Sequence, residues 1–93
     1  MTYLREVAER LRAELADRLP PDDVDDLLLI YAVLLRAKGV AVSAEDVHDA
    51  WTAWKEIRGE SHPSAIPFAE LPATVQAQDE PFVRAIRSVA AAC

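Results

Sequence analysis

The sequence predicts an all-α fold: a compact four-helix domain with an extended proline-rich loop and one short extra helical turn. Four segments carry apolar residues at helical spacing, and each is bounded by capping or helix-breaking residues. Only two of the 93 residues are glycine, while 52% are apolar, which is typical of a globular helical chain. This length fits one domain, 1–93, made of an N-terminal helical hairpin, 1–39, and a second part, 43–92.

The first helix is expected over residues 3–19. Leu4, Leu11 and Leu15 recur at helical spacing, with charged residues on the other faces. The Pro20-Pro21 pair then ends the helix, because proline lacks an amide hydrogen and restricts the residue before it.

The second helix is expected to start at Asp22 or Asp23 and to end at Lys38, before Gly39. One face carries Val24, Leu27, Leu28, Tyr31, Leu34 and Leu35, and the opposite face carries Leu29, Ile30 and Val33. A helix that is apolar on two faces needs cover on both. It is therefore either the central helix of the fold or part of a homodimer formed through the first two helices.

The third helix is expected over residues 44–58, after a short extended link at 40–42. Ser43 and Asp46 have the spacing of a capping box, and Gly59 ends the helix. Both tryptophans, residues 51 and 54, lie on its apolar stripe. Both tryptophans are core residues, or the edge of one indole ring lines a pocket.

A proline-rich loop follows at residues 59–72. Its prolines favour an extended backbone, and we expect Phe68 and Leu71 to be buried beneath it. A small β-hairpin within residues 60–70 is the alternative. A helical turn at 72–77 and a last helix at 80–91, with Asp79 as its cap, complete the prediction.

The formal net charge of −6 indicates no nucleic-acid partner and no anionic membrane surface, since both need clusters of Lys and Arg. The longest apolar run, residues 27–35, is too short to span a bilayer. Cys93 is the single cysteine, so no intramolecular disulfide can form and a cytoplasmic location is expected. Frequent alanine, and arginine exceeding lysine eight to two, favour a GC-rich genome such as that of an actinobacterium or its phage.

No enzyme motif is present: the sequence lacks GxSxG, GxxxxGK[ST] and GxGxxG. The two histidines do not form an HExxH pair, and no Cys/His spacing suits zinc. We therefore expect no catalysis, no metal and no cofactor.

The candidate ligand-binding residues are His48, Trp51, Lys55, Arg58 and His62. His48 and Lys55 lie seven residues apart along one edge of the third helix, with Trp51 between them. These three suit an anionic ligand with a flat ring, which would stack on indole and pair with lysine. The alternative makes His48 a boundary residue, Lys55 a solvated one and His62 a residue that only pins the loop.

Residues 45–90 resemble the ryanodine-receptor-type repeat, or RyR domain. The resemblance rests on a helix of the form VHDAWTAWK, followed by a loop of the form HPSAIPFAELP. The matching residues are His48, Trp51, Trp54, Lys55, Gly59, His62, Pro63, Pro67, Phe68, Leu71, Pro72 and Asp79. The resemblance implies a recognition module, with nucleotide-like ligands among its targets.

The sequence thus favours a non-catalytic small binding module that recognises a nucleotide-like anionic ligand or a protein partner. The alternative is a phage or bacterial accessory protein that acts only through protein contacts, including homodimerisation, and has no small-molecule site. The two differ in whether His48, Trp51 and His62 converge on one open cleft.

Overall fold

Four longer helices and one helical turn form the fold in the computed structural model, which describes residues 2–92. The helices are α1 (Tyr3–Glu14), α2 (Asp25–Lys38), α3 (Ala44–Ile57), α4 (Ala73–Gln76) and α5 (Glu80–Ala92). Three 3-10 turns accompany them: η1 (Gly39–Ala41), η2 (Phe68–Glu70) and η3 (Ala77–Asp79). Residues 2–92 contain no strand, so the all-α prediction is confirmed and the β-hairpin alternative is wrong.

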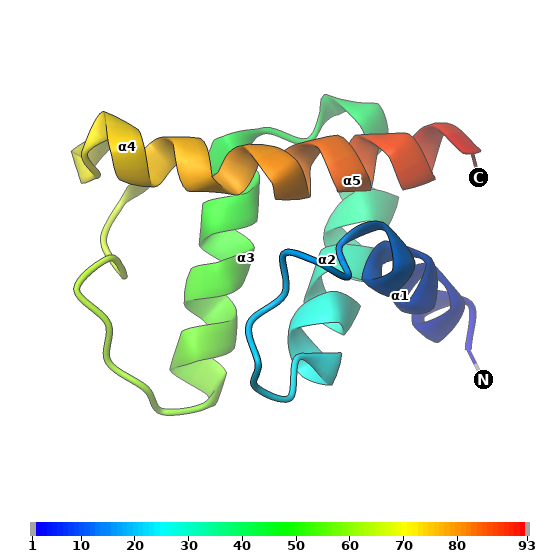
Figure 1. Ribbon diagram of the computed structural model, residues 1–93, viewed down its shortest axis with the longest axis horizontal. Helices are drawn as coiled ribbons and strands as arrows, with labels where there is room; N and C mark the ends of the chain where they lie inside the picture. The colour runs from blue at the N-terminus through cyan, green and yellow to red at the C-terminus, as the bar shows by residue number, and fades with distance from the viewer. Residues whose placement is uncertain (1, 93) are drawn as a thin grey trace.

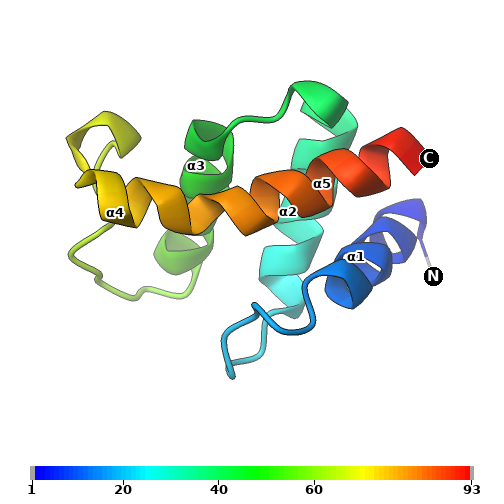
Figure 2. The same ribbon diagram turned by 45° about the horizontal axis from the view of Figure 1, so that its top comes forward.

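Helix α2 is the central helix. It contacts α1, α3 and α5, and Figure 1 shows α3 on one side of it and α1 on the other, with α5 crossing above. The turned view in Figure 2 shows α5 still crossing α2 and α3. One apolar face of α2 is therefore buried within the chain. The opposite face is only half-buried at Leu29 and Ile30, and Val33 on it is 51% exposed.

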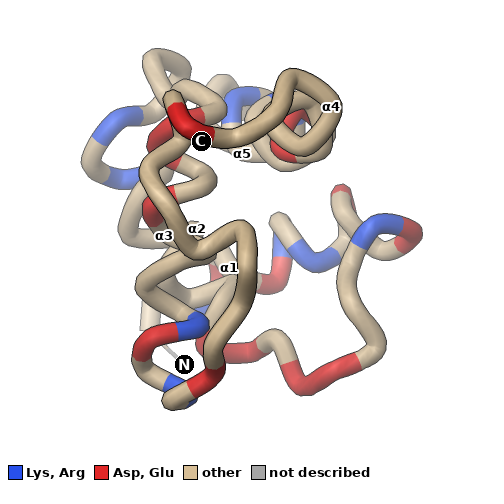
Figure 3. Tube along the Cα trace, turned by 90° about the vertical axis from the view of Figure 1, so that its left-hand side faces the viewer, with Lys and Arg blue, Asp and Glu red and all other residues tan. Residues whose placement is uncertain are grey.

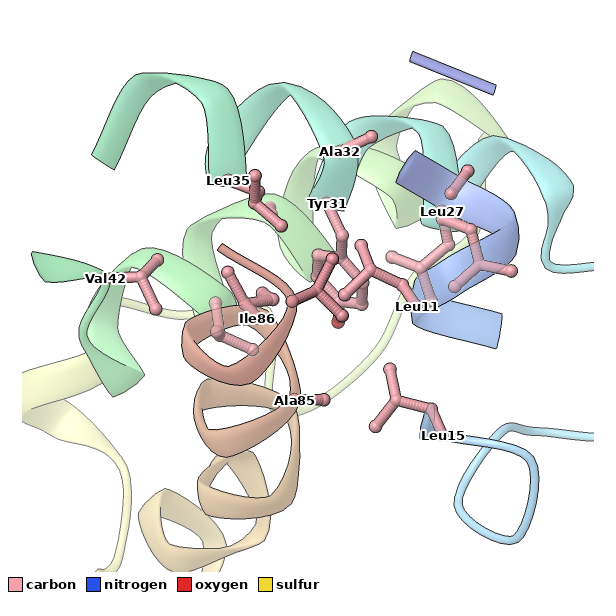
Figure 4. Packing of buried hydrophobic residues seen from close by; sticks show 14 of the residues in the cluster. Leu11, Leu15, Leu27, Tyr31, Ala32, Leu35, Val42, Ala85 and Ile86 are labelled. Atoms are coloured by element: carbon pink, nitrogen blue, oxygen red, sulfur yellow. The ribbon is translucent and has the colours of Figure 1, made fainter. Parts of the chain in front are cut away.

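Aliphatic side chains fill the space between α1, α2 and α5. Figure 4 shows Leu11, Leu27 and Ile86 pointing into this space from the three helices. These residues are at most 1% exposed. Full burial of a side chain of this size stabilises the fold by about 1.5–3 kcal/mol before entropy is counted. This core is the main source of cohesion between the hairpin and the last helix.

The first two helices are shorter than predicted. Helix α1 ends at Glu14, because the chain turns at Leu15, which is buried beyond the helix end. The helical spacing of Leu15 reflects burial rather than a continuing helix. Helix α2 begins at Asp25, where the Asp23 carboxylate accepts a hydrogen bond from the Asp25 amide at 3.1 Å.

The start of α3 follows its local signals. The Ser43 hydroxyl accepts from the Asp46 amide at 3.2 Å, and the Asp46 carboxylate accepts from the Ser43 amide at 2.9 Å. The predicted capping box is confirmed. Before it, residues 40–42 are not an extended link: Gly39 has a φ of 56° and opens the turn η1.

The proline-rich loop is packed less deeply than expected. Leu71 is buried as predicted, whereas Phe68 is only half-buried and opens η2. The Gln76 side-chain amide donates to the carbonyls of both residues, at 2.9 Å to Phe68 and 3.2 Å to Leu71. Asp79 does not cap the last helix, because η3 continues directly into α5.

Candidate functional site

A cleft of about 210 Å³ lies where α3, the loop after it and η3 come together. Leu27, Val75 and Phe82 form apolar parts of its lining. The turn after α1 contributes Arg18, the one Arg or Lys among the described lining residues. The site is therefore built from segments far apart in the sequence.

Three of the predicted residues meet in this cleft: His48, Trp51 and His62. The imidazole of His48 stacks near the Trp51 indole, with ring centres 5.7 Å apart and planes 26° apart. The His62 ring stands edge-on to the same indole at 5.0 Å and 87°. The two tryptophans have different roles, since Trp54 is 1% exposed in the core and Trp51 lines the cleft.

Lys55 and Arg58 do not line the cleft. The Lys55 ammonium lies 3.7 Å from the Glu60 carboxylate, and the Arg58 guanidinium donates to the same carboxylate. The hydrogen bond from Arg58 lowers the pKa of Glu60. Both cations also lie over the Trp54 ring, at 5.0 Å and 4.8 Å from its centre. The Lys55 ammonium also lies 5.8 Å from the centre of the Trp51 ring, so the predicted neighbourhood of Trp51 and Lys55 is present. Its charge is nevertheless paired with Glu60 outside the cleft lining.

The hydrogen bonds of His48 fix its tautomer. Its ring is 4% exposed, and Nε2 lies 2.7 Å from the carbonyl oxygen of Ile66. A carbonyl only accepts, so Nε2 carries the hydrogen and donates. In the neutral ring Nδ1 is then an acceptor, and it has no hydrogen-bond partner among residues 2–92. The same bond ties α3 to the loop.

His62 has the opposite arrangement. The Ser64 backbone amide donates to His62 Nδ1 at 3.0 Å, so this nitrogen must be an acceptor. In the neutral ring Nε2 therefore carries the hydrogen and is a donor. One ring nitrogen of His62 is thus bonded within the loop, while Nε2 has no hydrogen-bond partner among residues 2–92 and lies at the exposed end of the cleft.

Tyr31 and Asp79 also line the cleft, and the sequence did not indicate either as a site residue. Burial raises the pKa of the Tyr31 hydroxyl, and the negative charge of Asp79 adds to the shift. Burial also raises the pKa of Asp79, with His48 opposing the shift and Glu80 adding to it. The sequence signal at Asp79 is a polar residue at the start of an amphipathic helix, which predicts a cap and not a site residue.

Ser64 and Gln78 complete the polar part of the lining. Within residues 2–92, no three His, Cys, Asp or Glu side chains are grouped so that they could hold a metal ion. None of the helices in that part of the chain has the length and apolar character needed to cross a membrane. Figure 3 shows acidic and basic positions interspersed along the Cα trace.

One family matches nearly the whole chain: the domain of unknown function DUF7701, over residues 2–91. The chain belongs to the DUF7701 family. This match corrects the resemblance to the RyR domain, because DUF7701 includes the N-terminal hairpin and no RyR-type family is found. No curated protein and no solved structure matches the DUF7701 chain.

Proposed function

We propose that this protein is a non-catalytic, cytoplasmic binding module whose cleft takes a small planar ring. The observation that carries the proposal is the convergence of His48, Trp51 and His62 on one cleft, from a helix and a loop. Aromatic walls with a few convergent polar groups are typical of small-molecule sites. The single cysteine of the sequence supports the compartment, since the fold needs no disulfide.

The size and charge of the cleft favour a ring over a whole nucleotide. Its volume of about 210 Å³ lies below the roughly 300–1,000 Å³ that is usual for drug-sized ligands. Asp79 places a carboxyl group in the lining, while Lys55 is paired with Glu60 outside it. Arg18 is the lining cation that would attract an anion, so the anionic part of the predicted ligand depends on Arg18 rather than on Lys55. The flat ring is supported by Trp51 and the two histidines.

The test is an NMR titration of the ¹⁵N-labelled protein with a panel of planar aromatic heterocycles. Binding in the cleft should shift the indole signal of Trp51 and the amide signals of the other lining residues. Trp51→Ala should abolish the shifts of those amide signals. Ile57→Ala is the matched control, because it removes a 68% exposed apolar side chain from the same helix, outside the cleft lining. Unchanged binding by Trp51→Ala, or no shift with any ring, would refute the proposal.

A second candidate function is action through protein contacts alone, as a homodimer formed through α1 and α2. The exposed apolar side chains of Tyr3 and Val33, at 61% and 51%, favour it. Sedimentation equilibrium should then show a dimer that Val33→Asp dissociates. A monomer at the highest measurable concentration would remove this candidate.

A further inference from the structure

Asp79 is a half-buried carboxyl group in the cleft lining without a hydrogen bond or ion pair among residues 2–92. Buried polar groups are normally paired within the protein, and a charged group pays a desolvation penalty when it is not. Burial raises the pKa of this carboxyl group. Its oxygens therefore accept no hydrogen bond from residues 2–92.

Two further polar atoms of the residues that line the cleft have no hydrogen-bond partner among residues 2–92: Nδ1 of His48 and the Tyr31 hydroxyl oxygen. Neither forms a hydrogen bond in the described chain, yet the only fully buried side-chain polar atom without a partner there is Trp54 Nε1. Both atoms are therefore accessible, and both residues line the cleft. The Asp79 carboxylate and Nδ1 of His48 are acceptors, whereas the Tyr31 hydroxyl can both donate and accept. The donors at the exposed parts of the lining are Arg18, Gln78 and Nε2 of His62.

A ring whose edge carries adjacent ring N–H and amino groups would complement this arrangement. Such an edge donates two parallel hydrogen bonds to one carboxylate, which is the geometry that makes guanidinium–carboxylate pairs strong. The ring faces would contact Trp51 and Phe82, which line the same cleft. A carbocycle offers no donor to Asp79. An anion would be attracted by Arg18 and repelled by Asp79, so the two charges of the lining act against each other for such a ligand.

We propose that the cleft selects planar amino-heterocycles, with the amino edge of the ring directed at Asp79. This inference rests on the proposed function, because it names the ligand class of the same site. The carboxylate supplies the selectivity, whereas Trp51 and the apolar lining supply affinity for any flat ring.

Isothermal titration with two probes of nearly equal shape tests the inference: 2-aminobenzimidazole and 2-methylbenzimidazole. The wild-type protein should bind the amino compound about tenfold or more tightly, which corresponds to one charge-assisted hydrogen bond. D79N should lose this preference and bind the methyl compound as the wild type does. E80Q is the matched control, since it neutralises the adjacent carboxylate outside the lining and should keep the preference.

The outcomes separate the two proposals. Equal binding of both probes by the wild type, or a preference that survives in D79N, overturns the selectivity for amino-heterocycles and leaves ring binding intact. No binding of either probe, together with no response to the heterocycle panel, overturns the ring-binding function itself. Thermal melts check folding, and D79N is expected to fold because Asp79 makes no hydrogen bond within residues 2–92.

Discussion

The interior between α1, α2 and α5 is filled by aliphatic side chains, whereas the cleft beside α3 is lined by rings and ionisable groups. In the first region, Leu11, Leu28 and Ile86 are completely buried and need no polar partner. In the second, Asp79 and Nδ1 of His48 have no hydrogen-bond partner among residues 2–92. The aliphatic core therefore supplies most of the stability, whereas the cleft holds polar groups that lack hydrogen-bond partners.

Tyr31 joins the two regions. Its ring packs against Phe82 with centres 5.9 Å apart and belongs to the core cluster. The same residue lines the cleft. The core thus holds one wall of the cleft in place, and the difference between the regions can be tested by substitutions that act on one and not on the other.

The largest expected effect is in the aliphatic core. Leu28→Ala should cost about 2–5 kcal/mol, because Leu28 is fully buried and the change leaves a cavity. Total stability is commonly about 5–15 kcal/mol, so the urea midpoint should fall steeply. Val33→Ala on the same helix is the control and should change stability by about 0.5 kcal/mol or less. Equal losses from the two variants would contradict the placement of α2 at the centre.

Local signals in the sequence predicted the parts of the fold that local physics decides. Ser43 and Asp46 form their capping box through neighbouring backbone groups, and Gly39 adopts the left-handed conformation at the end of α2. The early end of α1 could not be predicted, because Leu15 keeps helical spacing while the chain turns to bury it. Tertiary packing overrides periodicity at such a boundary.

The candidate site was predictable only in part. His48 and Trp51 share one helix, and the proline-rich loop after that helix places His62 next to them. Tyr31 and Asp79 reach the same cleft from α2 and η3, and no spacing in the sequence relates those segments. The local motif also suggested the wrong family, since a match over half the chain ignored the hairpin that supplies Tyr31.

The next effect concerns a polar link beside the core. Arg87 donates from Nε and Nη2 to the Val42 carbonyl, at 3.0 Å and 2.7 Å, and so ties α5 to the segment after η1. Arg87→Ala should cost about 1.5–3 kcal/mol, as expected when a hydrogen bond from a charged group is lost. Arg84→Ala on the same helix is the control, because Arg84 has no such bond among the described residues. Matching melting temperatures for the two variants would show that the link contributes nothing.

A smaller effect is expected at the start of α3. Ser43→Ala should cost about 1 kcal/mol at neutral pH, because it removes a capping hydroxyl. The hydrogen bond from the Ser43 amide lowers the pKa of Asp46. A depressed pKa gives stability that is present above the unfolded-state pKa and lost as the pH falls through the folded-state value. The capping contribution of Asp46 should therefore disappear in acid denaturation curves, and Asp46→Ala should flatten that part of the curve.

The smallest expected effect is the change in stability caused by Asp79→Asn. It tests most directly whether the cleft differs from the core. Burial raises the pKa of Asp79 in the folded protein above its value in the unfolded chain. The folded protein therefore gains stability from the protonated carboxyl group below the unfolded-state pKa, and it loses this stability as the pH rises through the folded-state pKa. At neutral pH the ionised carboxylate therefore destabilises the wild type, by less than about 1 kcal/mol because solvent partly screens it.

Asp79→Asn should accordingly be slightly more stable than the wild type at neutral pH, and the difference should vanish in acid, where the wild-type carboxyl group is protonated. Glu80→Gln serves as the control for removal of a neighbouring negative charge. Urea titrations across the acid range measure both variants against the wild type. A loss of stability in Asp79→Asn at neutral pH would mean that the carboxylate is satisfied by the folded chain. The cleft would then resemble the core in needing no ligand to complete its interactions.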